Sequence, residues 1–207
     1  MSYTWQLFLL FALDSLMLSG LQAADALVRV RSIRFDTIPE NNGRGHWFET
    51  AVEVVAERNP SPEAYNPDFV DSVGVNVGLA TQSANGAENR LKFYRSTVTL
   101  ATLEQGRSVF VRFYLPPEIV KRDKVRGEPA AVMVELMVNG MPLEVHTENT
   151  TGLITNADRL DVFRKRLAEE AAPNDGILLP FHRSPFYARG HDSSEMDDPA
   201  VIIQSRD

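Results

Sequence analysis

Apolar and polar residues alternate with period two along seven or eight short segments between Val28 and Val145. Because successive side chains of a β-strand point to opposite faces of its sheet, this alternation is typical of strands with one buried face. Turn-forming residues separate the segments at regular intervals, as they do in two-layer antiparallel folds. The sequence therefore predicts a mainly β protein, with an antiparallel β-sandwich over residues 24–152.

The core of this sandwich is predicted from the inward positions of its strands. In residues 73–79, valine or leucine alternates with glycine and asparagine, so one face is apolar and the other nearly bare. A bare face admits close approach of another backbone or a partner, although a bend in the sheet is the commoner reason for such glycines. The residues expected to line the core are Val52, Val54, Val75, Val77, Val111, Phe113, Val134 and Leu136.

Local features predict how the strands bend and connect. The apolar residues change from even-numbered to odd-numbered positions between Val30 and Ile33. One extra residue in the strand, a β-bulge, would produce this change. Residues 91–93 and 98–100 are expected to form two separate strands. Asn139-Gly140 is the strongest hairpin signal in the chain and predicts a tight two-residue turn, with the return strand passing through Val145.

Beyond Gly152 the hydrophobic period becomes that of a helix, predicted over residues 153–172 with Thr155 as its cap. This helix either packs on the sandwich or lies in a partner's groove. Its apolar stripe consists of Leu160, Phe163, Leu167 and Ala171.

Residues 173–207 are predicted to be an extended, partly disordered tail. Its aromatic side chains Phe181, Phe186 and Tyr187 are the candidate partner-binding residues. Two arrangements of the tail remain open at this point. Either the tail folds back and covers a sheet edge itself, or the exposed edge and the tail bind an envelope protein, for example by strand addition.

Residues 1–23 have the features of an export signal. An apolar run from Leu7 to Leu18 precedes small residues, and it is shorter than the roughly 20 residues of a membrane-spanning helix. The mature protein is therefore expected to begin near Ala24 or Asp25 and to reach the periplasm, the outer membrane or the cell surface. An uncleaved leader would be its membrane attachment. The sequence leaves the oligomeric state open.

The composition excludes several classes of chemistry. The chain has no cysteine, so thiol catalysis, thiolate metal sites and lipoprotein anchoring are impossible. A net charge of −7 argues against nucleic acid as a partner, because phosphate binding needs clustered Lys and Arg. The histidines are far apart, and Glu49, Glu53 and Glu57 are expected to face solvent along one strand. The sequence therefore predicts neither an enzyme nor a metal or other cofactor.

Several stretches of the predicted strands and turns resemble a small group of exported bacterial proteins. These are immunoglobulin-like proteins encoded in type IV pilus-associated gene clusters and likened in fold to archaeal pilins. The stretches are Phe69–Val73, Lys92–Arg95, Arg112–Glu118 and Arg126–Pro129. The resemblance spans about residues 28–150 and implies an immunoglobulin-like sandwich in an envelope or pilus-associated protein without enzymatic activity, and it assigns no functional residue.

One departure concerns the leader. A bacterial type IV prepilin is cut before its hydrophobic segment, whereas the apolar run here precedes the expected cut. An accessory or surface-exposed role therefore fits better than that of a conventional pilin subunit.

Three functions are consistent with these observations. The first is a non-catalytic structural or interaction protein of the cell envelope or of a pilus. The second is a carbohydrate-binding module, which would need a planar row of exposed aromatic rings. The third is a glycan-acting enzyme, which would need two carboxylates facing each other in a cleft. The aromatic residues considered for sugar stacking are Trp47, Tyr65, Tyr94 and Tyr114.

Overall fold

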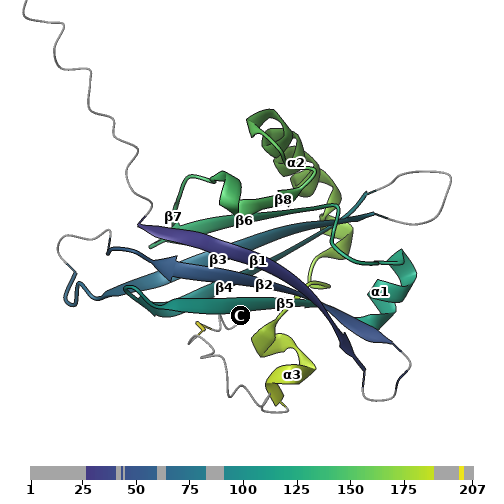
Figure 1. Ribbon diagram of the computed structural model, residues 1–207, viewed down its shortest axis with the longest axis horizontal. Coiled ribbons are helices and arrows are strands. Elements are labelled where there is room, and N and C mark those ends of the chain that lie inside the picture. Colours follow the sequence, from purple (N-terminus) through teal and green to yellow (C-terminus); the bar gives the residue numbers. More distant parts are fainter. Residues whose placement is uncertain are drawn as a thin grey trace, which may run out of the picture.

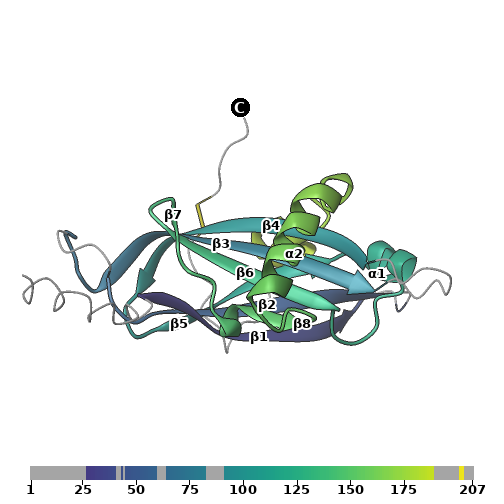
Figure 2. The same cartoon turned by 90° about the horizontal axis from the view of Figure 1, so that it is seen from above.

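The computed structural model describes residues 27–40, 43, 45–59, 64–82, 91–188 and 201–202. Two antiparallel sheets pack face to face and confirm the predicted β-sandwich (Figures 1 and 2). Sheet A contains, in spatial order, β1 (Val28–Pro39), β2 (His46–Ala56), β5 (Ser108–Leu115) and β9 (Leu179–Pro180). Sheet B contains β4 (Leu91–Glu104), β3 (Phe69–Gln82), β6 (Ala131–Val138) and β7 (Met141–Pro142), and β8 (Thr150–Gly152) also pairs with β6.

The predicted core residues lie between the two sheets. Each of the eight exposes at most 3% of its surface, and all belong to one hydrophobic cluster. Burying an aliphatic side chain of this size contributes about 2 kcal/mol. The period-two alternation therefore identified the inward faces of β2, β3, β5 and β6 correctly.

Two local predictions are confirmed by the backbone. The pairing of β1 with β2 shifts its register between Val30 and Ser32, which is the expected bulge. Asn139 and Gly140 join β6 to β7 with φ angles of 51° and 78°. Positive φ at both positions is what a two-residue hairpin turn of the favoured twist requires.

Two predictions about strand lengths are wrong. Residues 91–104 form one strand, β4, and not two, because pairing with β3 continues through the polar residues and places Ser96 opposite Val77. A small polar side chain does not interrupt the backbone ladder. The return strand after the hairpin is only Met141–Pro142, and the chain then leaves the sheet before Val145.

Short helical elements pack around the two sheets. They are α1 (Pro117–Asp123), α2 (Ala157–Glu170) and α3 (Pro185–Ala188), with the 3-10 turns η1 (Thr147–Asn149), η2 (Ala172–Asn174) and η3 (Phe181–Arg183). The cap of α2 is Asn156 and not the predicted Thr155. The side-chain oxygen of Asn156 accepts a hydrogen bond of 2.9 Å from the Arg159 amide, which satisfies one of the free donors of the first turn.

Helix α2 packs on the outer face of sheet B, as Figure 2 shows. The bare face of β3 makes this contact close. A Cβ atom at Gly78 would lie 2.5 Å from a methyl carbon of Leu167 and 3.2 Å from the ring of Phe163. The ring of Phe163 also lies 5.6 Å from that of Phe93 in β4. The missing side chain of Gly78 therefore allows α2 to approach β3 closely. Of the two alternatives that the sequence left open for this helix, the structure shows packing on the sandwich.

The described part of the tail is more structured than the extended, partly disordered segment that was predicted. Residues 172–188 form η2, β9, η3 and α3 in succession. Most of residues 189–207, residues 83–90 and the leader lie outside the described residues. Within the described part of the chain, no helix is long and apolar enough to cross a membrane.

Candidate interaction surface

The segment after α2 lies along the seam where β4 of sheet B faces β5 of sheet A. Leu178 is 1% exposed and belongs to the main core, and the next two residues pair with Phe113 and Tyr114 of β5. The Asn174 side-chain amide donates a 2.9 Å hydrogen bond to the Phe93 carbonyl of β4. This segment therefore holds the edges of both sheets together.

Beyond the seam, the chain turns onto the outer face of sheet A, where five aromatic residues form what we call the aromatic clasp. Its members are Trp47 of β2, Tyr114 of β5, Phe181 of η3, and Phe186 and Tyr187 of α3. Phe186 is 7% exposed, and its ring centroid lies 4.8 Å from that of Tyr114 and 5.4 Å from that of Trp47. Phe186 therefore anchors α3 to the sheet, as the position of α3 in Figure 1 illustrates.

The other two predicted partner-binding residues lie at the surface of the clasp. Tyr187 is 59% exposed, and its ring meets that of the half-buried Phe181 edge-on, with centroids 5.7 Å apart. The structure thus brings all three predicted residues together but divides their roles. Trp47 and Tyr114 were not predicted as members of this site. One sequence signal could have indicated them: Trp47 and Tyr114 are aromatic residues at outward positions of their strands.

The aromatic residues considered for sugar stacking are not grouped in one row. Tyr94 and Tyr114 are buried, Tyr65 is fully exposed in a loop, and Trp47 packs against Phe186 with an interplanar angle of 74°. A flat platform for a sugar ring needs rings of similar orientation. The aromatic clasp does not have this geometry.

The glutamates of β2 lie on the same outer face of sheet A as the clasp, and the position of Glu53 corrects the sequence prediction. Glu53 is only 8% exposed and does not face solvent. The Ser32 hydroxyl donates to its carboxylate at 2.8 Å, and the Arg31 and Arg34 guanidinium groups lie at 3.6 and 3.8 Å. Burial raises the pKa of Glu53, but hydrogen bonds from Ser32 and Ser108 and the positive charges of Arg31 and Arg34 outweigh it and lower the pKa overall.

Glu49, the next outward carboxylate on β2, lies 3.8 Å from Arg112 of β5. Glu49 and Glu53 are therefore neighbours on one strand, each beside arginine, and they do not face each other across a cleft. The lowered pKa of Glu53 disfavours the protonated acid that glycoside hydrolysis requires.

A second buried polar cluster joins α1 to β4 at one end of the sandwich. The hydroxyl of Tyr94 donates to the Asp123 carboxylate, which also accepts two 2.9 Å hydrogen bonds from the Arg122 guanidinium. Tyr94 is fully buried and Asp123 is 3% exposed. Burial raises the pKa of Asp123, yet the hydrogen bonds from Arg122 and Tyr94 lower it overall. The cluster attaches the helix to the sheet.

We expect Asp123→Asn to lower the free energy of unfolding at pH 7 by about 2 kcal/mol, because it removes the charge that Arg122 and Tyr94 bind. The folded-state pKa of Asp123 lies below its ordinary value of 3.8, so its contribution is complete above pH 3.8 and is lost as the pH falls through the lowered value. Urea denaturation at pH 7 and pH 3 measures both effects. A difference between wild type and variant that grows in acid would contradict the assignment.

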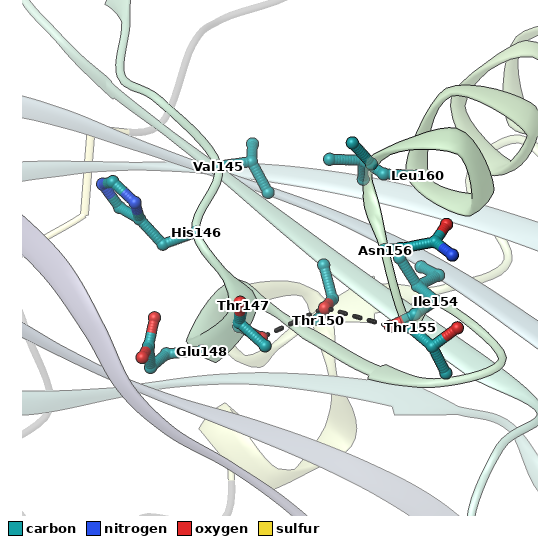
Figure 3. A pocket seen from close by; sticks show the side chains of 10 residues that line it. Val145, His146, Thr147, Glu148, Thr150, Ile154, Thr155, Asn156 and Leu160 are labelled. Atoms are coloured by element: carbon teal, nitrogen blue, oxygen red, sulfur yellow. Dashed lines mark hydrogen bonds between the residues drawn. The ribbon is translucent and has the colours of Figure 1, made fainter.

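A surface pocket of about 430 Å³ lies between η1 and the start of α2 (Figure 3). His146, Glu148 and Thr155 contribute to its lining. The Thr150 hydroxyl in its centre donates to the Thr147 carbonyl at 3.1 Å and so closes the η1 turn. Among the described residues, His, Asp and Glu side chains form no group of three that could hold a metal ion. Two polar side chains of this pocket, Thr150 and Asn156, form hydrogen bonds that support the local backbone structure.

No protein-family model matches the sequence, and no curated protein is significantly similar to it. Among solved structures, the crystal structure of a protein from Akkermansia muciniphila is similar, with a TM-score of 0.60. The match covers 86% of this chain and 93% of that chain at 15% sequence identity. This similarity concerns the fold, a β-sandwich of immunoglobulin-like type, and it transfers no activity.

Proposed function

We propose that this protein is a non-catalytic interaction module that binds an extended segment of another protein at the aromatic clasp. The observation that carries the proposal is the division of roles in the tail, where buried Phe186 fixes α3 and leaves Tyr187 and Phe181 at the surface. Aromatic side chains that are held rigidly and partly exposed are the residues that most often dominate protein interfaces.

The neighbouring sheet edge supports the same function. Among the described residues, only Leu179 and Pro180 pair with the outer edge of β5, and they reach only Phe113 and Tyr114. The preceding part of β5 starts at Ser108. An extended partner segment would gain backbone hydrogen bonds along this edge and side-chain contacts on the clasp, which is recognition by strand addition.

We place this function in the bacterial cell envelope, either in the periplasm, at the outer membrane or at the cell surface. The support is the leader-like sequence of residues 1–23 together with the complete lack of cysteine. The finer assignment to a pilus-associated system is supported by the four resembling stretches, which include Arg112–Glu118 of β5 and α1.

The proposal is tested by photo-crosslinking in native envelopes. A benzophenone amino acid at position 187 is expected to form an adduct with one defined protein, whereas the same group at the exposed loop residue Tyr65 is not. The adduct identifies the partner, whose affinity for the purified protein is then measured.

For that partner, the double variant Phe181→Ser/Tyr187→Ser is expected to bind at least about tenfold more weakly, because each removed ring contributes on the order of 1 kcal/mol. Its melting temperature should fall less than that of a variant without the buried Phe186 ring, since Tyr187 is 59% exposed and Phe181 is half-buried. Phe186→Ser, by contrast, should lower stability as well. Unchanged affinity of the double variant would contradict the proposal, and competition by soluble glycan would favour the carbohydrate-binding alternative.

A further inference from the structure

The outer side of β1 is an edge of sheet A, and the two ends of this edge are blocked in different ways. β1 pairs with β2 on one side, and no described residue forms a strand ladder with the other side. The bulge after Val30 disrupts the backbone at one end, and Pro39 at the other end lacks the amide hydrogen that a ladder needs. Bulges and prolines prevent strand addition, and residues 32–38 between them contain neither.

A hollow of about 440 Å³ lies beside this unblocked stretch. Ile33, Phe35 and Thr37 from the inward face of β1 line it, and so do Arg34 and Asp36 from the outward face. Because side chains from both faces of one strand line the hollow, it lies at the backbone edge between them. Ile33 and Phe35 are only partly buried and pack against the main core. The edge therefore presents apolar side chains next to free backbone groups.

Two opposite charges flank Phe35 at the centre of this stretch. The Arg34 side chain is 66% exposed, and its guanidinium group lies 3.8 Å from the Glu53 carboxylate. Asp36 is exposed and stands opposite Glu49 of β2, so two like charges are neighbours there. In the described part of the chain, no lysine or arginine forms an ion pair with Asp36. The edge thus carries a basic and an acidic group at equal distances from its middle residue.

We propose that this edge binds a second copy of the same chain, with the two β1 strands antiparallel and a two-fold axis through Phe35. In this register Phe35 lies opposite the second copy's Phe35, and Arg34 lies opposite the second copy's Asp36. The axis repeats each contact, which gives two ion pairs beside one aromatic pair. The bulge and Pro39 fall at equal distances from the axis. An unrelated partner strand would not require an edge that is symmetric about its middle residue.

This dimer leaves the aromatic clasp free. The clasp lies over β2 and β5 on the outer face of sheet A, whereas the pairing uses the backbone edge of β1. The two sheets A would join into one continuous sheet that carries two partner-binding surfaces. Self-association and partner binding are measured separately, so either proposal can fail without the other.

The first test reverses the two charges in the full chain and measures association by sedimentation equilibrium. Arg34→Asp and Asp36→Arg should each associate about thirtyfold more weakly than the wild type, because each substitution places like charges opposite each other twice across the axis. An equimolar mixture of the two variants should form a heterodimer, since every acidic group then faces a basic one. The double variant should associate like the wild type for the same reason. Lys165→Asp, a charge reversal at an exposed residue of α2, should have no effect.

The second test does not depend on charge or on the stability of those variants. The chain has no cysteine, so a single introduced cysteine forms a disulfide only between copies. The axis places position 35 opposite itself at about 5 Å between Cα atoms, which a disulfide can bridge. Phe35→Cys should therefore give a covalent dimer under mild oxidation. Thr37→Cys is the matched control, because position 37 is more exposed but its counterpart lies about 13 Å further along the strand.

Four results would overturn the proposal. A wild-type protein that stays monomeric at its highest soluble concentration would show that the edge does not bind a second copy. A dimer that is insensitive to the charge reversals, or folded variants whose mixture does not associate, would place the interface elsewhere. Equal crosslinking of Phe35→Cys and Thr37→Cys would exclude an axis through Phe35. Assemblies larger than a dimer would show that the pairing is not closed by a two-fold axis.

Discussion

Val77→Asp is expected to lower the free energy of unfolding by about 4 kcal/mol or more, which is enough to unfold many domains of this size. Val77 is 1% exposed in the middle of β3, between Ser96 of β4 and Val134 of β6. An aspartate there would place an unpaired carboxylate in the apolar layer between the sheets, where no water can solvate it. Urea denaturation followed by circular dichroism measures the loss.

The matched control is Val162→Asp, the same substitution on α2 at a side chain that is 53% exposed. It should change stability by no more than about 0.5 kcal/mol, as surface substitutions usually do. If Val77→Asp melted like the wild type, the faces of β3 would be reversed, and Gly74 and Gly78 would have to face the core.

Gly152→Ala is expected to lower the free energy of unfolding by about 3 kcal/mol, because its conformation and its surroundings both exclude a side chain. Gly152 ends β8 with φ +68°, and a Cβ there would lie 2.2 Å from the Ala130 carbonyl oxygen. That atom belongs to the backbone next to β6 and cannot rotate away as a side chain would. Equilibrium denaturation of the purified variant gives the value.

Gly140→Ala separates the two causes. Gly140 has a similar φ of +78°, but a Cβ at this position meets nothing within 4 Å. Its cost of about 1 kcal/mol therefore measures the backbone conformation alone. The excess for Gly152→Ala measures the contact with Ala130. Equal costs at the two glycines would mean that β8 moves away from Ala130 at little expense.

The features that could be predicted from the sequence are those encoded by residues close together in the chain. Alternation places Val75 and Val77 on one face of β3 whatever that face packs against, since the strand period is a property of the backbone. The Asn139-Gly140 turn and the bulge near Ser32 depend on two or three residues each. These signals were sufficient to predict a sandwich, its inward faces and most of its strands.

The features that required the tertiary structure are those that join residues distant in sequence. Phe186 and Tyr187 are adjacent aromatic residues, and only the positions of Trp47 and Tyr114 make the first a buried anchor and leave the second exposed. Glu53 occupies an outward position in the alternation of β2, which predicts exposure. It is buried because Ser32 and the arginines of β1 surround it.

The surface proposed to bind a partner belongs to this second group. Local periodicity determines which side of a strand is apolar, because it arises from geometry within one segment. Which strand forms an edge, and which part of the tail covers it, depends on pairings such as Phe113 with Pro180 and Leu100 with Val201. Such pairings are selected by packing of the whole chain, since each contributes too little free energy to form alone. The sequence alone therefore determined the two-layer core of this protein, and only the tertiary structure decided which aromatic residues and which sheet edges remain at its surface.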